Sequence, residues 1–213
     1  MVKLVCFLLL SCTCAQAQRT SPFPEQTTFL RFNFLGLVDP SDMYAGFGAE
    51  RMVKPSVAVS ADLGYIYFSN QYPNAKSATG FIVRPAVRYY TGQRTLFFEG
   101  ELQFKMVTNR IEDWLGKNAV NGVPGYEEFT TFRYRRNVSG FHIKCGRVLP
   151  ITADRKLWWE VYAGIGLRRY SYKVLDNPRS VYEYETWFGG RQRDEVNFAI
   201  AVPFGVRLLW KAR

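Results

Sequence analysis

The chain has 213 residues, a formal net charge of +10 and a hydrophobic content of 47%. This length suits one domain with a full core or one small barrel, and after the N-terminal leader no stretch reaches the roughly 18 to 20 consecutive apolar residues that a membrane helix needs. Basic residues alternate along the predicted strands instead of forming runs, and an exported chain rarely meets nucleic acid, so we expect no nucleic-acid partner.

The N-terminus has the layout of a secretory signal peptide. Lys3 precedes the apolar run Leu4–Leu10, and small and polar residues follow it. This order of a basic, an apolar and a small-residue region is typical of a cleaved leader. We therefore expect residues 1–17 to be removed and residues 18–27 to form a short periplasmic segment.

A lipoprotein signal is the alternative for this leader. Cys12 would then be acylated and retained, although Ala15 and Ala17 fit ordinary cleavage better. Cleavage after Ala17 leaves Cys145 as the single cysteine, so the mature chain cannot form an internal disulfide.

The rest of the chain, residues 28–213, resolves into segments in which apolar and polar residues alternate. This period of two predicts half-buried β-strands. The eight predicted strands lie near 28–38, 42–53, 56–69, 79–91, 94–108, 130–148, 156–175 and 195–211.

The connections between these strands alternate in length. The even ones are short, at 54–55, 91–93 and 150–155, whereas long stretches fall at 71–78, 109–129 and 176–194. Outer-membrane barrels have short periplasmic turns and longer extracellular loops. We therefore predict an all-β fold, an eight-stranded antiparallel up-and-down transmembrane β-barrel integral to the outer membrane, with both termini periplasmic.

Each strand has one apolar and one charged face. In the fifth segment Phe98, Leu102 and Phe104 share one face, and Glu99 and Glu101 take the other. An eight-stranded barrel is only wide enough for side chains to fill it, so charges inside it must pair, and we expect a closed lumen and no open pore. The charged residues assigned to this lumen are Arg31, Glu50, Asp62, Arg84, Arg88, Glu99, Glu101, Lys105, Lys144, Glu160, Arg168 and Arg207.

Aromatic residues gather near both ends of the strands, as two membrane interfaces would select. Beside the short turns lie Tyr89, Tyr90, Phe97, Trp158, Trp159 and Trp210. Beside the long loops lie Tyr65, Tyr67, Phe132, Tyr134, Tyr170 and Tyr172. The membrane-interface aromatics that we predict are Tyr65, Tyr67, Tyr89, Trp159, Tyr170 and Trp210. The alternative is a soluble exported barrel that turns its apolar face inward and binds an apolar ligand, as lipocalins do.

The last strand carries a C-terminal pattern of Gly205, Leu208 and Trp210. It resembles the targeting signal of outer-membrane barrels, and it implies contact with the barrel-assembly machinery. The tail at 211–213 departs from that signal, which usually ends at the aromatic residue.

The stretches Arg84–Tyr90 and Ala163–Arg168 add to this pattern. Residues 28–213 thus resemble small outer-membrane barrels of the OmpA-barrel type, especially the uncharacterised families of that shape. Those families include tethers, adhesins and a few lipid-modifying enzymes, so the resemblance implies location and no particular activity.

The sole histidine, His142, raises the question of catalysis with Ser139 and Glu160. Ser139 and His142 have opposite parity in a regular strand and should face opposite sides of the wall. We therefore predict no catalytic residue, and we keep a lipid- or lipopolysaccharide-modifying enzyme as an alternative. One histidine and one cysteine cannot supply the usual ligands of a transition metal, and we expect no metal and no cofactor.

The long stretches 109–129 and 176–194 are the predicted binding regions. They contain aromatic residues beside carboxylates, in Ile111–Gly116 and Val181–Phe188, a composition that suits protein or carbohydrate contacts. The second run could instead form a hairpin above the membrane. We predict a structural or surface-interaction role, with the basic excess in contact with lipid headgroups or lipopolysaccharide phosphates.

Overall fold

The computed structural model describes residues 23–24, 26–38, 41–91, 95–176, 179–185, 191–193 and 196–212. The predicted signal peptide at 1–17 lies outside the described residues. No helix among the residues described is long and apolar enough to span a membrane.

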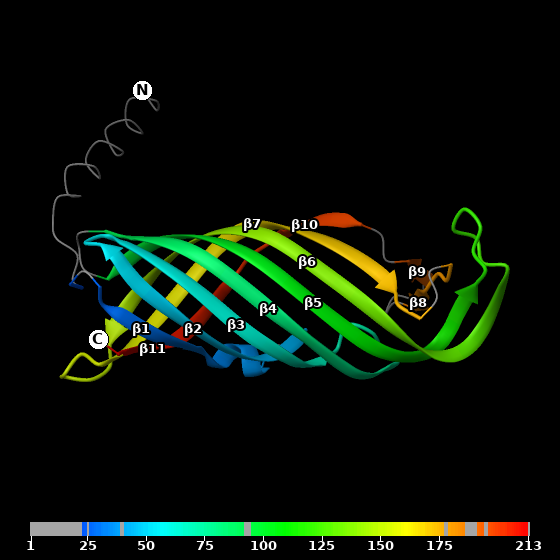
Figure 1. The fold of residues 1–213 in the computed structure, drawn as a ribbon, viewed down its shortest axis with the longest axis horizontal. Helices are drawn as coiled ribbons and strands as arrows, with labels where there is room; N and C mark the ends of the chain where they lie inside the picture. The colour runs from blue at the N-terminus through cyan, green and yellow to red at the C-terminus, as the bar shows by residue number, and fades with distance from the viewer. Residues whose placement is uncertain are drawn as a thin grey trace, which may run out of the picture.

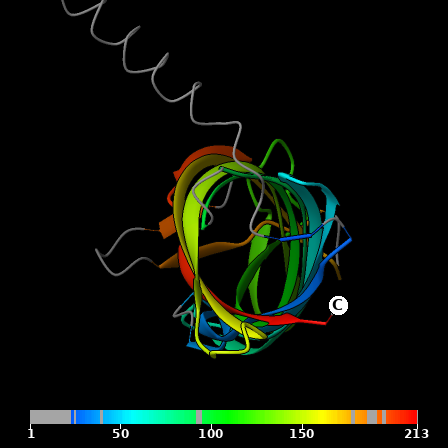
Figure 2. The same cartoon turned by 90° about the vertical axis from the view of Figure 1, so that its left-hand side faces the viewer.

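The chain forms a closed antiparallel barrel (Figures 1 and 2). In chain order the elements are β1 (Thr28–Asn33), the 3₁₀ helix η1 (Phe34–Val38), β2 (Asp42–Lys54), β3 (Val57–Ser69), β4 (Ala75–Tyr90), β5 (Leu96–Lys117), β6 (Tyr126–Pro150), β7 (Leu157–Val174), β8 (Glu183–Glu185), β9 (Arg191–Arg193), β10 (Asn197–Ala201) and β11 (Phe204–Lys211). Strands β10 and β11 form the two halves of the eighth wall strand. Because β11 pairs with both β1 and β7, the ring closes, and the predicted eight-stranded barrel is confirmed.

Period-two alternation determines which side chains fill the barrel. On β3, Asp62 is buried whereas its neighbours Ala61 and Leu63 are exposed on the outer wall. The same alternation holds along β5, where Glu99 and Glu101 are buried. The outer wall is therefore apolar and the interior charged, the reverse of a lipocalin-like barrel, and that alternative is wrong.

The first strand is shorter than the predicted 28–38. It ends at Asn33 and continues as η1. Residues 34–38 are all apolar or glycine and lack the alternation that maintains a strand. Gly36 fits closely over the ring of Tyr44, where a Cβ would lie 2.6 Å from Cζ, so this turn of helix depends on the missing side chain.

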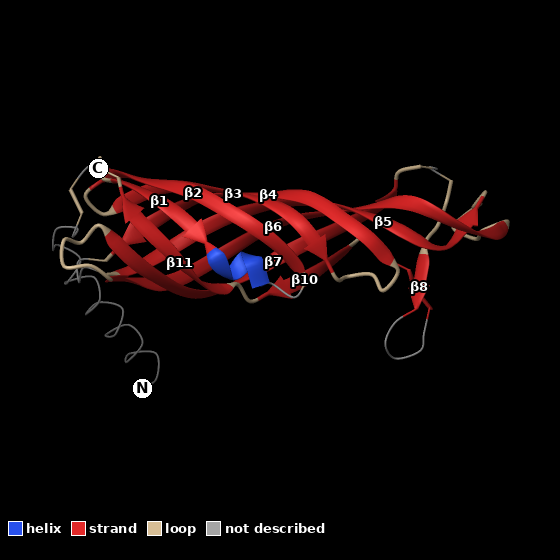
Figure 3. Cartoon of the chain, turned by 90° about the horizontal axis from the view of Figure 1, so that it is seen from below, coloured by secondary structure: helices blue, strands red, loops and turns tan. Residues whose placement is uncertain are grey.

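The predicted loop at 109–129 is mostly a hairpin. Strands β5 and β6 stay paired out to Lys117 and Tyr126, leaving a connection of residues 118–125. Asn118, Asn121 and Gly122 have positive φ values there, as a tight turn requires. The hairpin protrudes beyond the other strands (Figures 1 and 3).

The predicted loop at 71–78 is also shortened, because β4 begins at Ala75. In the stretch 176–194, β8 and β9 form a separate two-stranded sheet. Val181 folds back to form an antiparallel bridge with Gly116 of β5, so this segment is attached to the hairpin.

Candidate functional site

Arg88 lies at the centre of a charged network inside the barrel. It is fully buried on β4. Its guanidinium donates to both oxygens of Glu160, at 2.8 and 3.0 Å, and to Glu99 at 2.9 Å. Glu50 lies 2.9 Å from the same group, and the ring of Phe97 packs 3.8 Å from the guanidinium carbon. Planar guanidinium groups suit such multiple carboxylate contacts.

Two further arginines complete the positive side of this network. Arg207 on β11 donates to Glu160 at 2.8 Å and lies 3.3 Å from Asp62. Arg31 on β1 lies 3.5 Å from Asp62 and 3.7 Å from Glu50. Buried charges are tolerated when they are paired, so the network holds strands from all sides of the barrel together.

His142 lies at the next level of the lumen and is fully buried. Arg168 Nε donates to His142 Nε2 at 3.2 Å. That nitrogen must therefore accept, which places the ring proton on Nδ1, 3.1 Å from Glu101 Oε1. Lys144 also contacts Glu101. Both ring nitrogens of the histidine therefore have hydrogen-bond partners within the network.

A second, smaller network lies nearer the protruding hairpin. Asp42 pairs with both Lys105 and Arg136. Arg84 bonds a hydroxyl group instead of a carboxylate: its guanidinium donates to the Tyr44 hydroxyl at 2.8 Å. Sequence reasoning did not include Asp42, the first residue of the predicted strand 42–53, or Arg136 among the charged residues of the lumen. Each lies an even number of positions from inward-facing residues of its strand, and this spacing could have identified both residues.

Seven of the twelve aromatic residues expected at the membrane interfaces point into the barrel. The inward residues are Tyr90, Phe97, Trp158, Phe132, Tyr134, Tyr170 and Tyr172. The prediction for Tyr170 as an interface residue is therefore wrong: it lies half-buried on the inner face of β7, stacked on Tyr172. Their positions near the strand ends suggested a membrane interface. Side chains alternate between the two sides of a strand, however, so the position in this alternation decides whether a residue faces inward or outward.

Most of these inward aromatics belong to two clusters, one at each end of the barrel. At the end of the short turns, Phe23 packs edge-on against Phe29, Tyr90 and Trp158, at centroid distances of 4.8 to 5.5 Å. Residue 23 belongs to the segment expected to be periplasmic, yet it is buried within the barrel mouth. At the hairpin end the cluster consists of Tyr72, Ile111, Leu115, Phe132, Tyr134, Val174 and Tyr182.

The outward residues of the predicted interface set lie on the apolar wall. The side chains exposed there are Tyr65, Tyr67, Tyr89, Trp159 and Trp210. In the predicted targeting pattern, Leu208 also faces outward, opposite Phe32 of β1. Gly205 faces inward and packs under Tyr162, whose hydroxyl would lie 2.6 Å from an added Cβ.

Cations mark both edges of the apolar wall on β6. Outward residues between Arg147 and Ser139 are Phe141, Ile143 and Cys145, and Arg135 lies beyond. The two arginines are twelve residues apart, about 40 Å along the strand and roughly 30 Å along the axis of a barrel with strands tilted by about 40°. That span is close to the hydrocarbon thickness of a bilayer.

The outer mouth places aromatic residues beside carboxylates. Trp114 and Phe129, opposite one another on the hairpin, are both about half exposed and pack edge-on at 5.7 Å. Tyr182 is buried and donates to Asp113 at 3.0 Å. The hairpin therefore presents an aromatic surface, and the 179–185 segment is held to it.

A charged contact ties the start of that segment to β6. The side chain of Arg133 donates to Asp176 Oδ1 at 2.7 and 2.8 Å, and its backbone N–H donates to Oδ2 at 2.6 Å. These hydrogen bonds hold the pKa of Asp176 below its ordinary value.

The residues weighed for catalysis do not come together. Ser139 is exposed on the outer wall, whereas His142 is buried inside. Glu160 bonds Arg88 and Arg207. Among the described residues no group of three or more His, Cys, Asp or Glu could hold a metal ion.

Comparison with known proteins assigns this chain to no family. No family model and no curated protein matches the chain. Among solved structures, the β domain of the Bordetella autotransporter BrkA is similar, with 16% identity, coverage of 86% of this chain and 69% of that chain, and a TM-score of 0.44. This similarity assigns no role to any residue here.

Proposed function

We propose that this chain is an integral outer-membrane barrel with a closed lumen and a structural or surface-interaction role. The observation that carries this proposal is the distribution of polarity, which is the reverse of that in a soluble barrel: a largely apolar outer wall encloses a buried charge network. In water such a wall would be an aggregation liability, whereas in a bilayer it is the lowest-energy surface.

The arrangement of the ends supports one orientation. The C-terminal strand β11 and the short turns lie at one end of the barrel, and the β5–β6 hairpin protrudes from the other (Figure 1). In outer-membrane barrels the short turns are periplasmic. The proposed extracellular parts are therefore the regions 109–129 and 176–194.

A filled interior favours a role outside the lumen. Charged pairs occupy its middle, and apolar and aromatic clusters occupy both ends. We propose that the chain is not a pore and that the hairpin surface around Trp114 and Phe129 contacts a protein or carbohydrate at the cell surface. Outer-membrane lipid and lipopolysaccharide would surround the wall, and the barrel-assembly machinery would insert it by the Gly205–Trp210 pattern.

We also propose that the barrel is not an enzyme. Both ring nitrogens of His142 are engaged, by Glu101 and Arg168, which leaves none to activate a nucleophile. The alternative, a lipid- or lipopolysaccharide-modifying enzyme, predicts an altered lipid composition in cells when His142→Ala is expressed. Unchanged lipid profiles in wild-type and variant cells would support the non-enzymatic role.

The test of location is fractionation of cells that express the full chain. We expect recovery with the outer membrane, and a band in detergent whose gel mobility changes on boiling, because folded barrels resist detergent until heated. A tag inserted at Asn121 should react with antibody on intact cells. Recovery in the soluble periplasm would contradict the proposal.

The test of surface interaction uses the purified barrel in nanodiscs and arrays of glycans and surface proteins. Trp114→Ser/Phe129→Ser should lose any ligand that the wild type captures. Leu63→Ser/Phe98→Ser, which removes two exposed apolar residues from the lipid-facing wall, is the matched control. Equal capture by both variants would move the binding surface away from the hairpin.

A further inference from the structure

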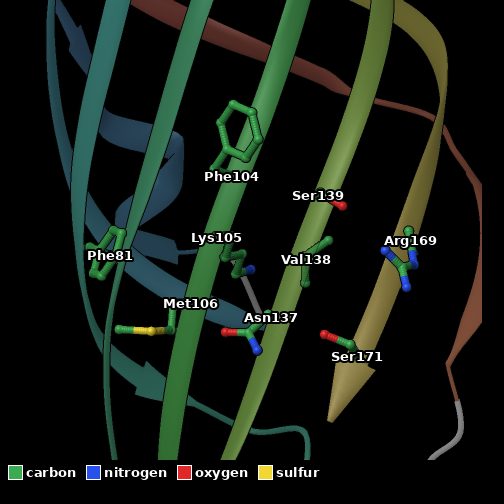
Figure 4. A pocket seen from close by; sticks show the side chains of 9 residues that line it. All are labelled: Phe81, Phe104, Lys105, Met106, Asn137, Val138, Ser139, Arg169 and Ser171. Carbon is green, nitrogen blue, oxygen red and sulfur yellow. The ribbon is translucent and has the colours of Figure 1, made fainter.

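The apolar outer wall is interrupted by a groove that extends over β4, β5, β6 and β7. Its lining includes the apolar side chains of Phe81, Phe104 and Met106 and the small polar side chains of Ser139 on β6 and Ser171 on β7 (Figure 4). The groove has a volume of about 270 Å³. It exists because small side chains stand where large apolar ones would continue the wall.

Its register places the groove at the hairpin-side edge of the apolar band. Phe141 of β6 pairs with Leu167 of β7, both exposed and apolar. The next outward pair is Ser139 with Arg169, and the following one is Asn137 with Ser171. The groove therefore lies in the hairpin-side part of the band, on the membrane side of Arg135, where polar pairs replace the apolar ones.

Exposed cations surround this groove on its outer side. Arg169 is one of the groove residues, and Lys173 lies opposite Arg135 one step beyond Ser171. Arg110 of β5 also faces outward, opposite Arg133.

Four of these cations have no acidic partner among the residues that the structure describes. Arg133 is neutralised by Asp176. Within the described part of the chain, no ion pair is formed by Arg110, Arg135, Arg169 or Lys173. Four cations that lack an acidic partner in the described part of the chain, beside an apolar groove, attract an anion attached to an apolar tail.

We propose that this groove binds an outer-leaflet lipid whose headgroup carries two phosphates, with an acyl chain against Phe104 and the phosphates on the surrounding cations. The inference rests on the proposed membrane location and specifies a ligand site for it. Guanidinium groups form paired hydrogen bonds with phosphate oxygens.

The spacing of the cations favours two phosphates over one. Arg169 lies four residues before Lys173 on β7, roughly 13 Å along the strand. Arg135 lies beside Lys173, so the cations form two separate groups. A single phosphate could neutralise only one of them.

The experiment measures lipid affinity by native mass spectrometry of the delipidated barrel in detergent. The probes are lipid A with both phosphates, its monophosphorylated form, and phosphatidylglycerol. The test variant is Arg169→Gln/Lys173→Gln. The matched control is Arg51→Gln/Lys54→Gln, which removes the same two charges from exposed positions of β2.

We expect the wild type to prefer the bisphosphorylated lipid over both other probes. The test variant should lose roughly thirtyfold in affinity for it, since each cation near an anionic lipid surface contributes about fivefold. The control should remain within about twofold of the wild type. Equal affinities of the test and control variants would overturn the site, and equal binding of phosphatidylglycerol would overturn the two-phosphate assignment.

Failure of the proposed location has a different readout. Each variant is first checked for a heat-modifiable band and for insertion into vesicles of phosphatidylcholine. If the wild type fails these checks, the membrane proposal and the lipid site both fall. If it passes them and shows no preference among the three lipids, only the lipid site falls.

Discussion

Arg88 and Glu160 form a two-pronged ion pair across the lumen, with N–O distances of 2.8 and 3.0 Å, although they lie on strands that are not neighbours in the wall. Both side chains are fully buried. The pair therefore joins opposite parts of the barrel through its interior, independently of the backbone hydrogen bonds around the ring.

Replacing Arg88 with Met should destabilise the barrel by about 3–5 kcal/mol, because Glu160 and Glu99 would be left buried without their main partner. Urea-induced unfolding in detergent, followed by tryptophan fluorescence, measures this change. Arg51→Gln on the outer wall should change the free energy of unfolding by less than about 0.5 kcal/mol. If Arg88→Met is as stable as the wild type, the network has no role in stability.

The double variant Arg88→Met/Glu160→Met should cost less than the sum of the two single variants. Removing both partners leaves fewer uncompensated charges than removing one. Strict additivity would mean that the contact has no coupling energy.

Gly164→Ala should destabilise the barrel by about 1–3 kcal/mol. An added Cβ would lie 2.3 Å from the Ile143 carbonyl oxygen and 2.9 Å from the Lys144 Cα, and backbone atoms cannot move aside cheaply. Gly100→Ala is the control, because its nearest neighbour, on Phe141, is 3.9 Å away. Thermal loss of the heat-modifiable band should distinguish the two, and equal midpoints would refute the packing argument.

Leu102→Arg should reduce the stability of the barrel in lipid vesicles by about 2–4 kcal/mol, because this exposed side chain lies within the apolar band. Thr79→Arg, on the outer wall beyond the band, should cost at most about 1 kcal/mol. Equilibrium folding into vesicles at graded urea concentrations gives both values. A larger cost at Thr79 would shift the proposed position of the membrane.

Tyr182→Ala should detach the 179–185 segment from the mouth. The ring packs 4.9 Å from Phe132, and the hydroxyl bonds Asp113. Removal of a fully buried aromatic ring costs about 3–5 kcal/mol of stability. The segment should therefore detach more often, and trypsin should cleave after Arg179 at least about ten times faster. Tyr126→Ala, at an exposed position of the hairpin, should leave the cleavage rate unchanged.

The contact between Arg133 and Asp176 should weaken in acid. Hydrogen bonding lowers the pKa of Asp176 in the folded state. The contribution of this contact to the free energy of unfolding is therefore complete above the unfolded-state pKa of about 3.9, and it is lost as the pH falls through the folded-state pKa. Carboxyl carbon NMR should give a midpoint below 3.9 for the wild type. Arg133→Gln should raise this midpoint toward the unfolded value, although the backbone N–H of residue 133 still donates to Asp176, and an unchanged midpoint would assign the shift to another cause.

The sequence by itself determined the number of strands, the ring order and the two faces of the wall. These properties depend on period-two alternation and connection length, which are local and can be read from consecutive residues. The same parity indicated that Ser139 and His142 would lie on opposite sides of the wall. The alternation also indicated that Tyr170 faces inward, but its location near a strand end led to the prediction of an interface residue.

Only the tertiary structure decided which charges pair and where the hairpins end. Arg136 meets Asp42, 94 positions earlier in the chain, because barrel closure and strand tilt bring their strands to one level of the lumen. The alternation predicts that a side chain faces inward, but it does not predict which side chain it contacts across the barrel. In the same way, pairing of β5 with β6 out to Tyr126 depends on contacts between two strands, and no single strand encodes that length.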